Sequence, residues 1–184
     1  MGELTNNIAL TCDDENRRGG MRRVWVANKT NVTSFTAGVG IHTYTAVTMD
    51  TTADNFYEIQ SEFETSSYLS EGSIENGSAL KATTVTLKSP KMEKTKALAI
   101  QQLFESCKVV MVFSDYNGKA FVIGYDEFLK LDGAMKVQVS EALEEGLQGN
   151  NGYTLLFTGK AAEVAREYTG TIKVSTGTIT PATA

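Results

Sequence analysis

The chain has 184 residues, a formal net charge of −5 and 41% hydrophobic residues. This length fits a single hydrophobic core, so we expect residues 1–184 to form one domain. The acidic balance disfavours a specific nucleic-acid binder, which normally carries a basic patch. No apolar run is long enough to cross a bilayer, and the first residues lack the basic and apolar regions of a signal peptide. We therefore expect no membrane partner.

Patterns typical of strands dominate the first part of the chain. Residues 24–27 form a short apolar run, and residues 40–49 alternate well enough to be a second strand. In residues 57–65 the odd positions hold Tyr, Ile, Ser, Phe and Thr, and the even positions hold Glu or Gln. A period of two is typical of a half-buried strand, so we expect three strands in this region.

A fourth strand is expected at residues 83–88, where one face holds Thr, Val and Leu and the other holds two threonines and a lysine. Residues 66–81, just before it, are mostly small and polar and include the pair Asn76-Gly77. Asn-Gly tolerates the positive φ angles of a tight turn. We predict that residues 66–81 form a projecting hairpin or loop.

Residues 89–107 have the pattern of an amphipathic helix. Ser89 is a good N-cap, and Pro90 suits the first helical position. Apolar side chains then recur on one face, and lysines and glutamines occupy the others. The apolar face comprises Met92, Ala99, Ile100, Leu103, Phe104 and Cys107. We expect the helix to pack on a sheet, with Cys107 buried as a small hydrophobic residue.

The second part of the chain contains two Asn-Gly pairs, each just ahead of an apolar stretch that ends in Gly. The pair Asn117-Gly118 lies between two β-rich runs, which predicts a hairpin with a type I′ turn. Residues 153–157 and 168–174 are expected to be strands, and residues 137–147 fit either a helix or a strand. Residues 175–184 are rich in Thr, Ala, Gly and Pro, and we expect a flexible tail.

The glycine-rich stretches do not match a phosphate-binding loop. From Gly152 to Gly159 the spacing is too long for G-x-x-x-x-G-K-[ST], and Ala161 stands where Ser or Thr is required. A zinc site needs about four nitrogen or sulfur ligands. One histidine, His42, and the two cysteines Cys12 and Cys107 do not supply them. We therefore expect no cofactor and no metal.

Catalytic groups are equally sparse. His42 is the one base available to a serine or cysteine triad, and neither cysteine lies in a familiar nucleophile signature. A cysteine–histidine pair stays open as an alternative. Glu62 and Glu64 share a strand face, whereas a glycosidase needs carboxylates opposed across a sugar-sized cleft. We predict that the protein is not an enzyme and has no catalytic residues.

Together the elements predict a mainly β fold: a β-sandwich or partly closed barrel with one amphipathic α-helix packed on it. Three stretches of this sequence resemble a protein of tailed bacteriophages. They are GGMRRVWVANKTNVTSFT (19–36), FYEIQSEFETSSYLSEGSIENGS (56–78), and the pair SDYNGKAFVIGYDEFLKL and GNNGYTLLFTGK (114–131 and 149–160). The family that they resemble is the tail tube protein, as found in phages of the Bacteroidetes group. That family usually has Gly-Leu after the first hairpin, and this chain has Glu-Phe-Leu at 127–129.

The resemblance implies a virion structural protein that is assembled in the host cytoplasm. Its copies would form rings, usually homohexamers, that stack head to tail into a tube. The tube would meet other tail or neck proteins, and double-stranded DNA would pass through it without specific binding. A conduit should not hold DNA, because Lys and Arg contacts to phosphate add affinity. We therefore interpret Glu58, Glu62 and Glu64 as an acidic strand that faces the lumen; the alternative is an ordinary solvated face.

Two other classes of function stay open. One is another virion component, such as a head–tail connector ring, a tail terminator or a capsid decoration protein. The other is a carbohydrate-binding β-sandwich, which needs exposed aromatic side chains on one platform. Trp25 is the one tryptophan, and it lies between valines in an expected inner strand. The sequence therefore favours the virion component.

Overall fold

The computed structural model describes residues 19–39, 42–61, 65–75, 78–143 and 151–183. Within these ranges the protein is mainly β, with several sheets and one α-helix. Among these residues no sheet closes into a barrel. No helix in the described ranges is both long and apolar enough to span a membrane.

Seven strands form the larger sheet. In hydrogen-bonding order they are β2 (Val32–Ala37), β3 (Thr43–Met49), β11 (Arg166–Tyr168), β8 (Ala120–Ile123), β7 (Val109–Asp115), β1 (Met21–Asn28) and β4 (Tyr57–Ile59). β11 runs parallel to β3, and the other neighbours are antiparallel. β1 and β7 are rich in valine, as strands that are buried on both faces usually are.

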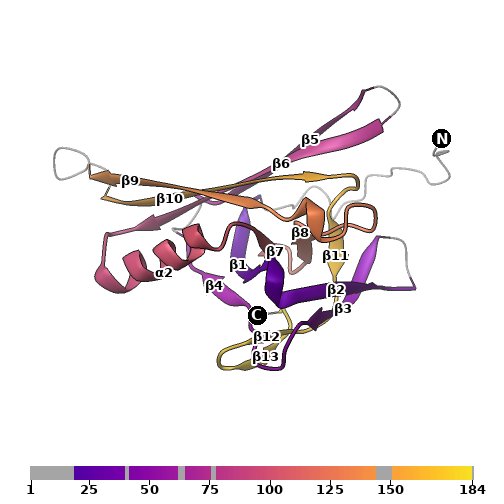
Figure 1. Ribbon diagram of the computed structural model, residues 1–184, viewed down its shortest axis with the longest axis horizontal. Coiled ribbons are helices and arrows are strands. Elements are labelled where there is room, and N and C mark those ends of the chain that lie inside the picture. Colours follow the sequence, from indigo (N-terminus) through magenta and orange to yellow (C-terminus); the bar gives the residue numbers. More distant parts are fainter. Residues whose placement is uncertain (1–18, 40–41, 62–64, 76–77, 144–150, 184) are drawn as a thin grey trace.

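Four long antiparallel strands form the second sheet. In order they are β5 (Ser67–Glu75), β6 (Ser78–Pro90), β10 (Asn151–Ala161) and β9 (Lys136–Leu143). The remaining elements are β12 (Ile172–Val174) paired with β13 (Gly177–Ile179), the helix α2 (Lys94–Glu105), and the short 3-10 turns η1 (Lys29–Asn31) and η2 (Leu131–Gly133). Figure 1 shows the four-stranded sheet lying across the larger sheet, with α2 at one end of the molecule and the projecting part of β5 and β6 at the other.

Two clusters of buried side chains lie on the two faces of the seven-stranded sheet. The first fills the space between the two large sheets and includes Leu87, Met111 and Phe157. The second lies on the opposite face and is rich in aromatic side chains, with Ile172 of β12 packed among them. Side chains of β1 alternate between the two clusters, so Val24 belongs to the first and its neighbour Trp25 to the second. The seven-stranded sheet is therefore the middle layer.

The predicted central hairpin is confirmed, but its turn differs from the expected type. β7 and β8 are antiparallel, and the Asp115 amide donates to the Lys119 carbonyl. Gly118 has φ +78, whereas Asn117 is not among the residues with positive φ. A type I′ turn needs positive φ at both central positions, so this loop is not one. The Asp115 carboxylate accepts from the amides of Asn117 and Lys119 and stabilises the loop instead.

The predicted start of the helix is wrong. Ser89 and Pro90 are the last residues of β6, where they pair with Tyr153 and Gly152 of β10. The helix begins at Lys94. Pairing with β10 continues through these positions, and it outweighs the local preference of Ser and Pro for a helix start. Proline is accommodated because it stands at the end of the strand.

The predicted apolar face of the helix is correct only in part. Ile100 and Leu103 are half-buried and pack against the cluster between the sheets. Phe104 is 54% exposed, and Met92 precedes the helix and is also exposed. Cys107 follows the helix with φ +61 and is an exposed free thiol, so the expectation that it is buried is wrong. The apolar stripe that contacts the core is narrower than the sequence indicated.

Two further predictions change in the C-terminal part. The expected strand at 168–174 is divided between β11 and β12, with Thr169 to Thr171 between them. Residues 175–184 were expected to form a flexible tail, yet 177–179 form β13, Pro181 is buried, and Ile179 and Ala182 pack against the aromatic cluster. The tail is ordered because the open face of the seven-stranded sheet needs cover, which composition alone does not reveal. The ambiguous segment 137–147 is strand β9 up to Leu143, and residues 144–150 lie outside the described part.

Candidate assembly surfaces

The four-stranded sheet has one apolar face and one polar face. Val85, Leu87, Leu155 and Phe157 point into the core and are fully or almost fully buried. Because side chains alternate along a strand, the intervening residues form the outer face. On the described strands these are Ser67, Leu69, Glu71, Ala82, Thr84, Thr86, Lys88, Lys136, Gln138, Ser140, Thr154, Leu156, Thr158 and Lys160, placed by the register of the three strand pairs. Half of these side chains carry a hydroxyl or an amide, four are charged (three lysines and one glutamate), and three are apolar.

Both outer strands of this sheet have a side with no strand partner among the described residues. β5 pairs only with β6, and β9 pairs only with β10. The backbone N–H and C=O groups on such an edge are open to pairing with another strand. Lys136 lies on β9 and Glu71 on β5, but neither edge carries a proline within its described span. The edges are therefore lightly protected against pairing.

The tip of the β5–β6 hairpin extends beyond the rest of the sheet. β10 pairs with β6 only as far as Lys81, which faces Ala161. The described residues 73–75 and 78–80, called the arm below, therefore continue as a two-stranded ribbon, which Figure 1 shows projecting from the molecule. Ile74 on the arm is 78% exposed and Leu80 is 41% exposed. The polar composition of residues 66–81 predicted a projecting hairpin or loop. The apolar side chains of Ile74 and Leu80 are the sequence signal that could have indicated a contact surface there.

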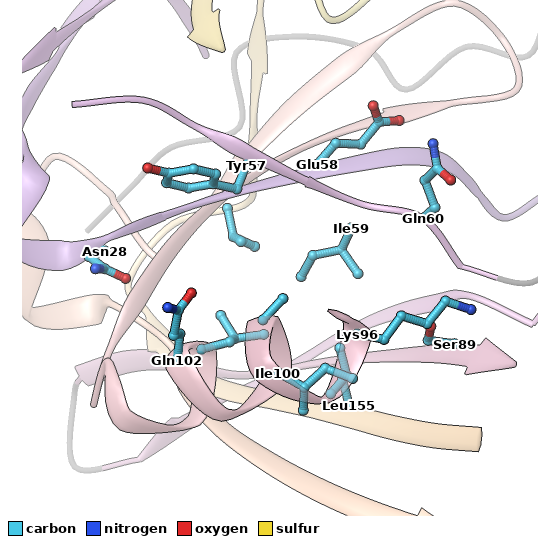
Figure 2. Close-up of a pocket in the computed structure, with 13 residues that line it drawn as sticks. Asn28, Tyr57, Glu58, Ile59, Gln60, Ser89, Lys96, Ile100, Gln102 and Leu155 are labelled. Atoms are coloured by element: carbon cyan, nitrogen blue, oxygen red, sulfur yellow. The ribbon is translucent and has the colours of Figure 1, made fainter. Parts of the chain in front are cut away.

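A groove lies at the other end of the molecule, between β4 and α2 (Figure 2). Its volume is about 530 Å³, and apolar side chains predominate among the residues that line it. The lining residues are Val26, Asn28, Tyr57, Glu58, Ile59, Gln60, Ser89, Lys96, Ala99, Ile100, Gln102, Leu103 and Leu155. β4 is the outer strand of its sheet, so its far edge has no strand partner in the described part of the chain. Sequence reasoning missed this groove because it depends on where β4 and α2 meet.

A buried carboxylate fixes the loops next to the base of the arm. Asp126 is 4% exposed and accepts hydrogen bonds from the amides of Phe128 (2.9 Å), Leu129 (2.5 Å) and Ala162 (2.8 Å). The Ala162 amide follows the last residue of β10, so Asp126 holds the end of that strand. Its role is structural, since a buried carboxylate needs such donors.

The other perturbed groups near these loops are also structural. Glu163 accepts two hydrogen bonds from Arg166, at 2.8 and 2.9 Å, and this contact raises the pKa of the Arg166 guanidinium. Burial raises the pKa of the Tyr44 and Tyr168 hydroxyls above their ordinary value. The Tyr168 hydroxyl donates to the Thr171 carbonyl at 2.7 Å. The Arg166–Glu163 pair and the hydrogen bond from Tyr168 to Thr171 therefore stabilise these loops.

The structure places the predicted acidic residues only in part. Glu58 lies on β4, in the larger sheet, and accepts two hydrogen bonds from Arg23 at 2.7 and 2.8 Å. The contact raises the pKa of the Arg23 guanidinium. Glu62 and Glu64 lie outside the described residues, and the strand that was expected over 57–65 is a strand over Tyr57–Ile59. Glu58 is therefore a paired residue on a sheet other than the one with the polar face.

The remaining residues of interest also lie apart. His42 is exposed with φ 58, just before β3. Trp25 is fully buried, so it cannot belong to an exposed aromatic platform. Among the described residues no three His, Cys, Asp or Glu side chains gather in a way that could hold a metal ion. Comparisons of the chain with protein-family models, with curated proteins and with solved structures found no match.

Proposed function

We propose that this protein is a self-assembling structural subunit of a virion, and specifically the subunit of a phage tail tube. The observation that carries the proposal is the four-stranded sheet, which has a polar outer face, two edges without strand partners among the described residues, and an arm that extends past the rest of the sheet. The sequence resemblance points to the same class of protein. The proposed function therefore rests on surfaces of the protein.

The two edges favour the formation of a ring. A free strand edge pairs readily with a strand of another chain. β5 and β9 are the opposite edges of one sheet, so β5 of one copy can pair with β9 of the next, and every copy would use the same two edges. A closed set of such contacts joins the sheets into one continuous barrel, which has no remaining edge. The resemblance implies six copies in that ring.

The polar face would then line the channel. Its hydroxyl and amide groups stay hydrated, which suits a wall along which a polyanion slides. On β6, β9 and β10 the described residues of this face include Lys88, Lys136 and Lys160 and no acid, so it is not the acidic wall that was inferred for Glu58, Glu62 and Glu64. Each lysine can add phosphate affinity through counterion release. We expect Gln at the three lysine positions to reduce salt-dependent retention of DNA by assembled tubes.

Another virion component remains the second candidate. A connector ring, a terminator or a decoration protein can use the same sheet edges without stacking into a long tube. The arm favours the tube, because a projection along the long axis suits contact with a neighbouring ring (Figure 1). A carbohydrate-binding β-sandwich is less favoured, since its aromatic platform would have to form without Trp25.

Electron microscopy of the purified chain tests this proposal. The expected result is tubes with a central channel, or rings that stack as the protein concentration rises. The matched variant lacks residues 73–80 and joins Gly72 to Lys81 through an Asn-Gly turn, which keeps the facing pair at the base of the arm. It should form rings that no longer stack. A wild-type chain that stays monomeric at high concentration contradicts the proposal, and closed rings that never stack favour the second candidate.

A further inference from the structure

We propose that the groove between α2 and β4 receives the arm of a second copy of this chain. The inference rests on the proposed self-assembly and names the contact by which one ring would hold the next. The arm and the groove lie at opposite ends of the molecule (Figure 1), so the arm cannot reach the groove of its own chain. Every copy carries both parts, and the contact is therefore available between any two copies.

The arm has apolar side chains on both of its faces. Ile74 faces Ala79 across the ribbon, and on the next rung Ser73 faces Leu80. Side chains of successive rungs point to opposite faces, so Ile74 and Leu80 lie on different sides of the ribbon. A two-stranded ribbon without further cover is marginally stable in water. Both faces of the arm therefore carry an exposed apolar side chain, and a groove with two walls would cover both.

The groove supplies two such walls. α2 contributes Ala99 and Leu103 on one side, and β4 contributes Tyr57 and Ile59 on the other. Figure 2 shows Ile59 pointing from β4 into the space above the helix. The far edge of β4 has no strand partner in the described ranges, so an arriving strand could add to it by backbone hydrogen bonds. The groove therefore offers side-chain contacts and an edge for a strand.

The charges of the two parts are complementary on the helix side. Residues 88–96, which lead into α2, carry four lysines and one acid, Glu93, and that acid is paired with Lys91 at 2.6 Å. Lys96 is among the residues that line the groove. At the base of the arm, Glu71 lies on the same face as Leu80, and Lys81 lies on the opposite face with Ile74. We therefore orient the Leu80 and Glu71 face toward α2 and the Ile74 face toward β4.

This contact is heterologous, since it joins two different surfaces of the same chain. Heterologous contacts continue into open stacks unless a rotation closes them. Contacts between sheet edges would close each ring, and the contact between arm and groove would extend the stack.

A charge exchange tests the contact at its helix side. Glu71→Lys and Lys96→Glu should each lower the self-association constant for stacking by about tenfold at low salt, because like charges then meet across the interface. The double variant should recover most of the wild-type association, measured by sedimentation velocity. Rescue of this kind does not occur if the two positions lie far apart, so a double variant no better than either single variant contradicts the orientation.

A plug in the groove tests the contact independently of charge. Ala99 is exposed and lines the groove, whereas Leu98 is exposed on the same helix and does not line it. Ala99→Trp should abolish stacking and leave ring formation intact, and Leu98→Trp should stack like the wild type. Circular dichroism and thermal unfolding confirm that both variants are folded.

The outcomes separate this inference from the proposed function. If the wild type stacks, and Ala99→Trp and Glu71→Lys stack equally well, the groove is not the receptor and the proposed function stands. If the wild type does not associate at all, both proposals are contradicted. Loss of stacking in Ala99→Trp together with rescue in the charge exchange supports the contact.

Discussion

The two halves of β6 show how differently one strand can be used. Val85, in the part that pairs with both β5 and β10, is fully buried between the sheets, as is Leu87 just beyond that part. Ala79, on the same face of β6 but in the part that pairs with β5 alone, is exposed, and its cross-strand partner Ile74 is 78% exposed. Both halves have β-forming sequences and the same backbone pairing on one side. The difference is the second neighbour, so the inner half is fixed by the fold of its own chain, and we propose that the outer half is covered by another copy.

The largest expected effect compares the same substitution in the two halves. Leu87→Ala should lower the free energy of unfolding by about 3 kcal/mol, because it leaves a cavity in a fully buried site. Leu80→Ala should change it by no more than about 0.5 kcal/mol in the dispersed chain, since exposed side chains contribute little to folding. Urea unfolding at low protein concentration measures both values. Equal costs would show that the arm is part of the core of its own chain.

A second, smaller effect concerns the point at which the arm leaves the sheet. Asp126→Ala should cost about 2 kcal/mol, because the amides of Phe128, Leu129 and Ala162 lose their acceptor. The matched control is Asp132→Ala, whose side chain is 87% exposed and contacts Lys29 at 3.1 Å; its cost should stay below about 0.5 kcal/mol. Thermal unfolding distinguishes the two. An unchanged thermal midpoint in Asp126→Ala would mean that Asp126 does not hold the end of β10.

The helix provides a third comparison between a covered and an open position. Leu103→Asp should cost about 1.5 kcal/mol, because it places a charge against the cluster between the sheets. Phe104→Asp should cost less than about 0.5 kcal/mol, because Phe104 already contacts solvent. The measurement is the urea midpoint of each variant. A larger effect at Phe104 than at Leu103 would reverse the assigned face of α2.

The smallest expected effect depends on pH. A hydrogen bond from Lys130 holds the pKa of Glu127 below its ordinary value of 4.5. A carboxyl whose pKa is lowered by folding stabilises the protein above its unfolded pKa, and that contribution is lost as the pH falls through the folded value. Glu127→Gln should therefore slightly flatten the loss of stability below pH 4.5, with no added dependence on pH in the neutral range. The measurement is the thermal midpoint of the wild type and of Glu127→Gln from pH 3 to pH 7. Profiles that are parallel throughout would contradict the contribution of Glu127 to stability.

Sequence patterns predicted the features that depend on neighbours along the chain. An apolar run located β1, strand patterns located β6 and β10, and the Asn117-Gly118 pair located the β7–β8 hairpin. The helix was found, but its start was placed at Ser89 because the pairing of that residue with Tyr153 is not visible locally. For the same reason the packing of the partly buried Ile179 and Ala182 against the aromatic cluster was missed. Local rules give the type of an element, whereas its ends depend on distant partners.

The surfaces were harder to predict than the strands. Glu58 was singled out for its charge, but its pairing with Arg23 depends on β1 and β4 lying side by side. The arm was identified as a projection, whereas its two apolar faces and the groove at the far end emerge only from the register and from the meeting of β4 with α2. A surface combines residues from several elements, and no single stretch of sequence carries it.

Hydrogen–deuterium exchange at increasing protein concentration tests the central claim most directly. The claim is that other copies of this chain cover the β5 and β9 edges and the arm. In the dilute chain the amides of β6 in its inner half and of β10 should already exchange slowly, because both strands have neighbours on each side. At high concentration the amides of β5, β9 and the arm should become slow as well. If the exchange in these three segments is the same at every concentration, no other copy covers them, and the account is contradicted.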